Sequence, residues 1–275
     1  MSTLDLPLIA NDRDITGFRP FKALHHFRNL IADKEDTKEV FFIIEALKGW
    51  KIRQQAEAFL RSDKARDFIV REDRLPIANM LDDHSRWADC GPDTVAQHYT
   101  RFMEREKLTA NGLVDESYEW RPREDRPADQ VEWYLNRLRD THDLFHVLTT
   151  YGRDALGEAA LLGFSFEQNH NLGVKFIAYA GARQIKKVTG TSAPLYAAIK
   201  EGRALGKAAK KLAHMDIEAV MREDIEIARA RLGVGQPVVY RECLRILENE
   251  GHVAEGLGLS EQSPDMCCDS GAQAA

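Results

Sequence analysis

Two histidines and two carboxylates lie close together near the middle of the chain. His142 and His146 are four residues apart, so on a helix they lie one turn apart on the same face. Asp143 falls beside that face, because it precedes His146 by three residues. Neutral imidazoles and carboxylate oxygens are ligands that suit a divalent cation such as zinc, iron or manganese. The spacing therefore predicts a metal site, and Glu158 is its fourth candidate ligand.

Glu158 can join this site only if the chain folds back on itself. On one straight helix it would lie about 18 Å beyond His146 and about 120° around the axis. A break stands midway, where Thr149 and Thr150 are soon followed by Gly152, a residue that can cap a helix C-terminus. We therefore expect two antiparallel helices that meet at Gly152, with the cation clamping the hairpin.

Composition narrows the class of protein. The chain has 275 residues, of which 44% are apolar and 30% charged, as is typical of soluble proteins. The formal net charge of -6 gives no electrostatic reason to expect nucleic-acid binding. No apolar run is long enough to span a membrane, and residues 1–17 resemble neither a secretory signal nor a transit peptide. We expect a cytoplasmic bacterial protein.

Helical periodicity predominates along the chain. No segment alternates with period two between hairpin turns, so we expect an all-α fold. The helical segments follow one another without a low-complexity linker and form a single multi-helix domain over residues 18–248. We expect a flexible N-terminus at 1–17 and, from its Gly, Ser and Ala content, a disordered tail at 249–275.

The elements that must position the cluster are two neighbouring helices. The longest periodic segment, 128–150, ends with the cluster, and a second helix is predicted over 154–169. Residues 107–127 form the least regular interior stretch, because an Asn-Gly pair and two prolines mark loops there.

Known metal sites can be compared with this pattern. A zinc protease needs a glutamate directly after the first histidine, where this chain has Asp143. A di-iron bundle needs two Glu-x-x-His elements, and a single histidine cluster disfavours it. A His-Asp phosphohydrolase is a closer alternative, with His98 as the upstream ligand and Asp216 as the downstream one. That arrangement leaves Glu158 unexplained.

Two arginines stand directly before the cluster. Arg137 and Arg139 could bind an anionic substrate group near the metal, because a guanidinium binds carboxylates through paired hydrogen bonds. The alternative is that they form ion pairs with Glu132, Asp140 or Asp143. The sequence leaves both interpretations open.

The signature His142-Asp143-x-x-His146 with Glu158 resembles that of the coenzyme Q (ubiquinone) biosynthesis protein four family. The resemblance covers roughly residues 18–245. This chain lacks one glycine of the family's turn before Tyr99 and has an aspartate where the lead-in to the signature has glutamate. The supporting segments are 36–41, 90–95, 137–140, 195–203 and 231–240.

The resemblance implies a function. Members of the family are all-helical, and they associate peripherally with the membrane that holds ubiquinone, here the inner (cytoplasmic) membrane. They are linked to oxidative decarboxylation at C1 of a polyprenylated 4-hydroxybenzoate-derived ring, and they are described as organising the other ubiquinone biosynthesis enzymes. By resemblance, His142, Asp143, His146 and Glu158 are the metal ligands and act in catalysis through the bound metal.

The residues themselves fit such chemistry. A divalent cation can bind the carboxylate or phenolate of the prenylated quinone precursor and stabilise the charge that develops as CO₂ leaves. The prenyl tail needs an apolar groove, for which 161–166 and 174–179 are candidate linings; core packing is their alternative role. A lipid-binding scaffold, in which the cation only staples the hairpin, is the alternative function. Metal identity and oligomeric state, including a homodimer, stay open.

Overall fold

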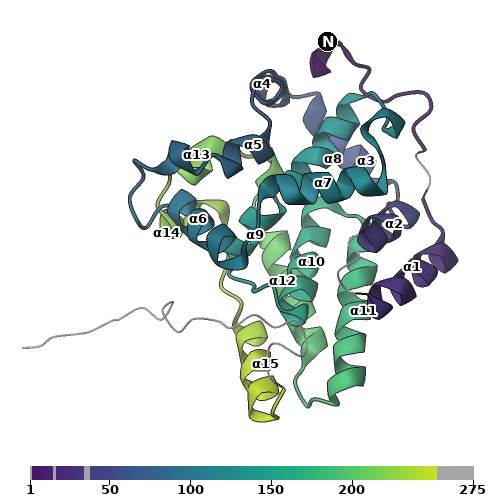
Figure 1. Cartoon of the computed structure of the whole chain (residues 1–275), viewed down its shortest axis with the longest axis vertical. Coiled ribbons are helices and arrows are strands. Elements are labelled where there is room, and N and C mark those ends of the chain that lie inside the picture. The colour runs from purple at the N-terminus through teal and green to yellow at the C-terminus, as the bar shows by residue number, and fades with distance from the viewer. Residues whose placement is uncertain (1, 15–16, 34–37, 253–275) are drawn as a thin grey trace, which may run out of the picture.

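The computed structural model describes residues 2–14, 17–33 and 38–252, and the regular elements in these ranges are helices (Figure 1). Extended backbone pairs there only in an isolated antiparallel bridge between Thr94 and Asp224. The prediction of an all-α, single-domain fold is confirmed. None of the described helices is both long and apolar enough to cross a membrane.

The bounds of the helices follow the chain order. The α-helices up to the cluster are α1 (Pro20–Ala32), α2 (Lys38–Ala46), α3 (Lys51–Leu60), α4 (Asp63–Glu72), α5 (Ile77–Asp82), α6 (Val95–Glu106), α7 (Ala110–Trp120), α8 (Gln130–Asp140) and α9 (His142–Thr149). After the cluster come α10 (Ala155–Asn169), α11 (Leu172–Thr189), α12 (Leu195–Ala208), α13 (Ile217–Met221), α14 (Ile225–Leu232) and α15 (Val238–Asn249). Short 3-10 helices are η1 (Thr3–Asp5), η2 (His84–Trp87), η3 (Arg123–Asp125) and η4 (Leu212–His214).

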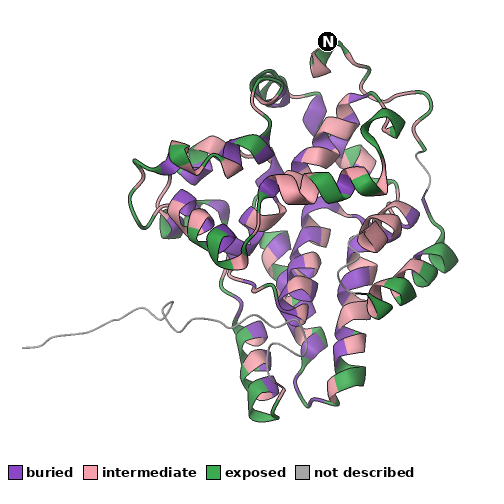
Figure 2. Cartoon of the chain, viewed as in Figure 1, coloured by how far each residue is buried: buried purple, intermediate pink, exposed green. Residues whose placement is uncertain are grey.

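Helix α10 lies at the centre of the molecule. It packs along α11 and α12, and it also contacts α9, α3 and α15. Its buried face runs nearly its whole length (Figure 2). Leu161, Phe164 and Ala178, from the two segments predicted to line a prenyl groove, are fully buried in the main hydrophobic core. For these side chains the alternative role of core packing is the one that the structure displays.

Glycines set the distance between α10 and α12. A Cβ atom on Gly202 would lie 2.3 Å from the carbonyl oxygen of Ala160, and one on Gly206 would lie 2.3 Å from that of Phe164. Backbone atoms cannot yield to such a contact, so only glycine permits this close crossing. The crossing fixes the position of α10, the helix that carries Glu158.

The prediction of one long helix over 128–150 is wrong, because the structure has two helices there, α8 and α9. Thr141 separates them, with backbone angles of φ -96° and ψ 4°. Its buried hydroxyl donates to the carbonyl oxygen of Arg137 at 2.9 Å, a side-chain bond that competes with the helical pattern. A new helix therefore begins at His142.

The stretch 107–127 is more regular than predicted, since it contains α7. Thr109 caps this helix by accepting the N–H of Gly112 at 3.0 Å. The carboxylate of Asp82 accepts two further N–H groups at the same helix end, from Ala110 at 2.6 Å and Asn111 at 3.0 Å. Two of these three hydrogen bonds come from Asp82, a residue far away in the sequence, which explains why the helix was missed.

Hydrogen bonds and an ion pair connect the described N-terminal residues 2–14, part of the segment predicted to be flexible, to the rest of the protein. Thr3 donates to Asp73 from its backbone N–H at 2.8 Å. Arg13 forms a bidentate ion pair with the buried carboxylate of Asp129, with both distances 2.6 Å. The disordered tail predicted for 249–275 lies outside the described residues beyond His252.

We expect Gly206→Ala to lower the free energy of unfolding by about 1–3 kcal/mol, because its methyl group overlaps the α10 backbone. The measurement is urea denaturation followed by circular dichroism. Gly181→Ala on α11 is the matched control, since its Cβ would meet only Ala159 Cβ at 3.8 Å. That control should stabilise the helix by about 0.5–1 kcal/mol. Equal stability of Gly206→Ala and the unmodified protein would refute the close crossing.

Candidate metal centre

The structure brings the four predicted ligand residues together. One ligand atom each from His142, Asp143 and His146 lies within 4.8 Å of the other two. Glu158, in the first turn of α10, faces both imidazoles: its carboxylate oxygens lie 3.8 Å from His142 Nε2 and 3.4 Å from His146 Nε2. Helices α9 and α10 and the turn that joins them, here called the hairpin, thus place the four residues close together.

The turn of the hairpin differs from the prediction, since Gly152 is not the helix cap. Helix α9 ends at Thr150, which adopts the left-handed conformation with φ 61°, and its N–H donates to the carbonyl oxygen of His146 at 2.8 Å. Gly152 lies just beyond and packs against Gly157, where a Cβ atom would lie 2.2 Å from the Gly152 carbonyl oxygen. The glycine that the turn requires is therefore Gly157.

Asp154 begins α10 and so sets the position of Glu158. Its buried carboxylate accepts the N–H groups of Leu156 at 3.1 Å and Gly157 at 2.9 Å, as an N-cap does. The hydroxyl of Tyr240 donates to the other carboxylate oxygen and accepts the N–H of Gly152 at 3.0 Å. Burial raises the pKa of Asp154 above its ordinary value, although these hydrogen bonds oppose the rise.

Arg229 of α14 holds the other end of the turn. Its guanidinium donates to the carbonyl oxygens of Val147 and Leu148, both at 2.9 Å, and the residue is 7% exposed. A cation at this place suits the partial negative charge of a helix C-terminus. Arg229 and Tyr240 therefore close the hairpin with protein groups alone.

The ring of His146 is fixed in one orientation. It is fully buried, it stacks on Phe102 with 5.6 Å between ring centroids, and its Nδ1 lies 3.0 Å from the carbonyl oxygen of Tyr151. A carbonyl only accepts, so Nδ1 carries a hydrogen, and Nε2, which faces Glu158, is the ring atom left to bind a cation. This backbone contact is typical of histidines that bind metals.

The Nε2 atom of His146 supplies the test of whether a cation fits. It is buried and forms no hydrogen bond within the part of the chain that the structure describes. A buried polar atom without a partner costs about 1–3 kcal/mol. Ligand atoms about 2.1 Å from a tetrahedral cation are about 3.4 Å apart. The His146–Glu158 separation of 3.4 Å matches that spacing, so the residues fit a divalent cation.

The charges of the cluster are strongly coupled. Burial raises the pKa of the Glu158 carboxyl, but the charge of His146 and the contacts with both imidazoles outweigh it and hold that pKa below its ordinary value. Burial lowers the pKa of His146, but Glu158, Asp143 and the Tyr151 carbonyl more than compensate and raise it. Binding of a divalent cation would therefore compete with protonation of His146.

Arg137 does not reach toward the cluster. The residue is 2% exposed, and its Nε donates to the carbonyl oxygen of Ala213 at 2.6 Å. Its other nitrogens donate to the carbonyl oxygen of Met215 and pair with Glu72. The guanidinium ties α8 to the segment around η4, so the geometry gives its predicted substrate-binding role no support.

Arg139 is also engaged within the protein. It forms an ion pair with Asp140 at 2.6 Å and donates to the hydroxyl of Ser117 at 2.6 Å. The alternative of pairing with Asp140 is confirmed for this arginine. As with Arg137, its contacts support a structural role.

The residues proposed for a His-Asp phosphohydrolase are not part of the ligand group that the described residues assemble. Asp216 caps α13 by accepting the N–H of Ala219 at 3.3 Å, and it pairs with Arg71 at 2.9 Å. His98 lies on α6, where burial and the nearby charge of Arg101 lower its pKa. The structure therefore favours Glu158 over Asp216 as the distant ligand.

Two residues beside the cluster were missed in the sequence. Arg153 Nε lies 3.8 Å from Glu158 Oε1. Tyr99 is fully buried, its hydroxyl has no hydrogen-bond partner among the described residues, and burial followed by the charge of Asp143 raises its pKa. A basic residue in the turn and a tyrosine on α6 carry no periodic signal, so spacing alone could not identify them.

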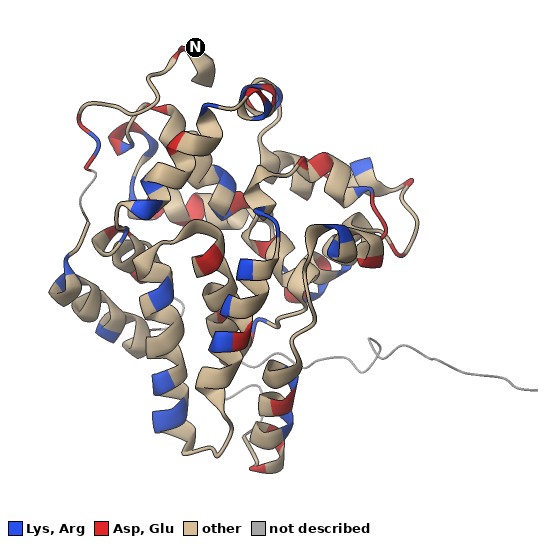
Figure 3. Cartoon of the chain, turned by 180° about the vertical axis from the view of Figure 1, so that it is seen from behind, with Lys and Arg blue, Asp and Glu red and all other residues tan. Residues whose placement is uncertain are grey.

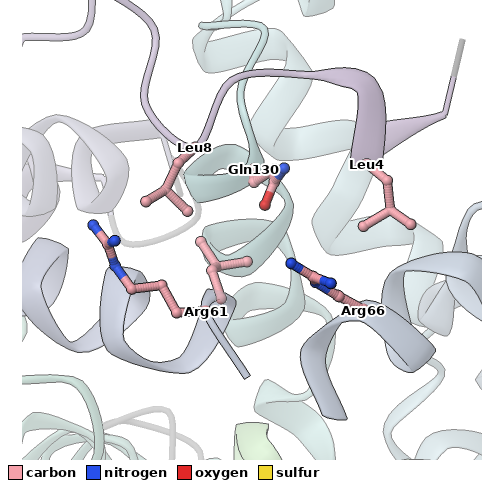
Figure 4. A pocket seen from close by; sticks show the side chains of 6 residues that line it. Leu4, Leu8, Arg61, Arg66 and Gln130 are labelled. Carbon is pink, nitrogen blue, oxygen red and sulfur yellow. The ribbon is translucent and has the colours of Figure 1, made fainter. Parts of the chain in front are cut away.

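A separate cavity of about 370 Å³ lies where the N-terminal segment meets α3, α4 and α8 (Figure 4). None of its lining residues belongs to the cluster. They are Leu4, Leu8, Leu60, Arg61, Arg66 and Gln130.

Comparisons with known proteins agree on one family. Residues 28–238 match the family model described as coenzyme Q (ubiquinone) biosynthesis protein Coq4. The mitochondrial ubiquinone biosynthesis protein COQ4 of Ajellomyces capsulatus (strain NAm1 / WU24) is 25% identical over 168 residues, which is 60% of this chain and 56% of that relative. That of Komagataella phaffii (strain GS115 / ATCC 20864) is 22% identical over 202 residues, 70% of this chain and 60% of the relative.

The matched part of the chain thus spans little more than half the length of these curated relatives. A solved structure, described as a ubiquinone biosynthesis protein from Nostoc punctiforme PCC 73102, superposes with a TM-score of 0.53 at 19% identity. It covers 79% of this chain and 99% of that one. This likeness shows a shared fold.

We expect Tyr240→Phe to lower the free energy of unfolding by about 1–3 kcal/mol, because Asp154 Oδ2 and the N–H of Gly152 both lose their hydrogen bond to the hydroxyl. Urea denaturation measures the change. Tyr196→Phe on α12 is the matched control: this side chain is 42% exposed, and its loss of a hydroxyl should change stability by less than about 0.5 kcal/mol. Equal effects of the two substitutions would contradict the role of Tyr240 in the turn.

Proposed function

The chain belongs to the coenzyme Q (ubiquinone) biosynthesis protein Coq4 family, and on that premise we propose that it is a metal-dependent decarboxylase of ubiquinone biosynthesis. Its substrate is a polyprenylated 4-hydroxybenzoate-derived ring, whose C1 carboxylate leaves as CO₂ and is replaced by a hydroxyl group. This replacement is a two-electron oxidation, for which a diffusible oxidant such as O₂ is the co-reactant. One observation carries the proposal: the buried Nε2 of His146 has no hydrogen-bond partner among the described residues and faces Glu158 at a ligand spacing.

The architecture of the hairpin favours chemistry over a purely structural role for the cation. Arg229 and Tyr240 already bind both ends of the turn, so α9 and α10 are joined without a metal. A cation that only stapled the hairpin would add little to these contacts. This supports catalysis as the role of the cluster.

The residues divide into a closed side and an open side. His146 is fully buried against Phe102, whereas the side chains of His142 and Glu158 are 28% and 33% exposed. His142, Asp143, His146 and Glu158 would hold the cation, which stabilises negative charge as CO₂ leaves. The protein excludes water on the His146 side, and the substrate carboxylate reaches the site on the Glu158 side.

A prenylated substrate is held in a membrane, and we propose that the protein binds the surface of the inner (cytoplasmic) membrane peripherally. Phe18 and Phe21 are 72% and 87% exposed at the start of α1. Arg19 and Lys22 stand beside them, and α1 contains no acidic residue. Figure 3 shows further basic residues along the neighbouring α11. Exposed aromatic and basic side chains together suit an anionic lipid surface.

We expect His146→Ala to abolish binding of one equivalent of divalent cation and to cause the carboxylated precursor to accumulate in cells. Elemental analysis of the purified protein and mass spectrometry of the lipids measure the two effects. His84→Ala, which changes a partly exposed histidine of η2, should do neither. Normal ubiquinone in His146→Ala cells would contradict the proposal. Metal binding with no turnover of a prenylated substrate would favour the lipid-binding scaffold instead.

We expect the double substitution Phe18→Glu and Phe21→Glu to weaken binding to anionic phospholipid vesicles at least about tenfold, because it replaces two apolar anchors by charges. Vesicle sedimentation measures the change. Ile227→Glu on α14, where the side chain is 64% exposed, is the control and should bind as the unmodified protein does. Equal losses for both variants would show that α1 is not the membrane contact.

A further inference from the structure

Arg153 lies in the turn between α9 and α10, and among the described residues its charge is paired only at long range, with Glu158. Its side chain is 38% exposed, and its Nε lies 3.8 Å from Glu158 Oε1, a distance too long for a hydrogen bond. Within residues 2–14, 17–33 and 38–252 its guanidinium donates no hydrogen bond. By contrast, the guanidinium groups of Arg137 and Arg229 donate hydrogen bonds to backbone carbonyl groups.

The position of Arg153 is fixed by the turn. It directly precedes Asp154, whose buried carboxylate caps α10, and it follows Gly152, whose N–H is bound by Tyr240. The backbone on both sides is therefore held, while the side chain is free to turn. Its Nε lies 3.8 Å from Glu158, whose side chain is 33% exposed, so the guanidinium is within reach of a ligand that binds beside this carboxylate.

The charges of the site with a divalent cation bound indicate which kind of ligand it would favour. Asp143 and Glu158 together balance the two positive charges of a divalent cation. Arg153 then adds one positive charge that nothing else in the cluster offsets. Like charges repel, so the arginine disfavours the cation alone but favours a cation that is accompanied by a single negative charge. A carboxylate supplies that charge and matches the planar donors of a guanidinium.

We propose that Arg153 is a substrate-binding residue that holds the carboxylate of the aromatic substrate jointly with the cation. This inference rests on the proposed function and adds the residue that selects a carboxylated ring. The cation and the carboxylate then bind with positive cooperativity. The carboxylate offsets the repulsion between the cation and Arg153, and the bound cation in turn attracts the carboxylate. Arg153 carries part of that coupling.

The test is isothermal titration of the full chain with Zn²⁺ and with 4-hydroxybenzoate, each alone and in the presence of the other. In Arg153→Gln we expect the affinity for 4-hydroxybenzoate in the presence of Zn²⁺ to fall about tenfold, within the usual range of coupling between two ligands. The affinity for Zn²⁺ alone should stay equal or rise. Arg153→Lys should retain part of the coupling, because it keeps the charge but loses the planar donors.

Two controls separate this role from a general effect on the turn. Arg241→Gln removes an exposed arginine that donates to Thr150 Oγ1 at 3.0 Å in the same turn, and it should leave the coupling unchanged. The neutral amide 4-hydroxybenzamide should bind the protein and Arg153→Gln equally. Circular dichroism checks that each variant is folded.

The outcomes are distinguishable. If Zn²⁺ binds but Arg153→Gln leaves the affinity for 4-hydroxybenzoate unchanged, or if the amide binds as well as the carboxylate, the role of Arg153 is overturned and the proposed function stands. If the unmodified protein binds no divalent cation, the proposed function falls and this inference falls with it. The inference is supported if the coupling between Zn²⁺ and 4-hydroxybenzoate is lost in Arg153→Gln and kept in Arg241→Gln.

Discussion

The hydroxyl of Tyr240 connects the two sides of the turn on which the site depends. It accepts the N–H of Gly152 and donates to Asp154, the carboxylate that begins α10. Because Asp154 fixes where α10 begins, it also fixes the position of Glu158 relative to His146. Arg229 holds the end of α9 in the same way, through two carbonyl groups. These contacts place the two halves of the cluster opposite each other.

The surrounding packing keeps this arrangement rigid. The close crossing at Gly202 and Gly206 fixes α10 against α12, and the stack on Phe102 fixes the ring of His146. A rigid site holds its ligand atoms near the geometry that a cation needs, so little ordering is left for the moment of binding. Its cost is the buried Nε2 of His146, which finds no hydrogen-bond partner among the described residues. A bound cation would offset that cost and would therefore couple metal binding to stability.

The sequence allowed the cluster, the hairpin and the all-α fold to be predicted, because each rests on local spacing. The four-residue separation of the histidines and the break before Glu158 are read directly along the chain. The details of the turn were not predictable in this way. Thr150 takes the left-handed cap, while the N–H of Gly152 is bound by Tyr240. Thr141 interrupts the long helix through its own side-chain hydrogen bond.

Contacts between distant segments explain the remaining differences. The cap that Asp82 provides for α7 joins residues far apart in the sequence, and so does the ion pair between Arg13 and Asp129. Arg137 looked available for a substrate beside the cluster, yet its partners come from η4 and α4. A single sequence carries no record of such pairings. These pairings determine which charged side chains near the site are available to bind a ligand.

The central claim is that His146 Nε2 and Glu158 are ligands of one divalent cation. Zinc K-edge X-ray absorption of the Zn²⁺-loaded protein tests it most directly. The account predicts two imidazole nitrogens at about 2.0–2.1 Å together with carboxylate oxygens at about 2.0–2.2 Å. It also predicts that His146→Ala removes one of the two imidazole contributions. A spectrum without histidine ligands, or one that His146→Ala leaves unchanged, would contradict the account.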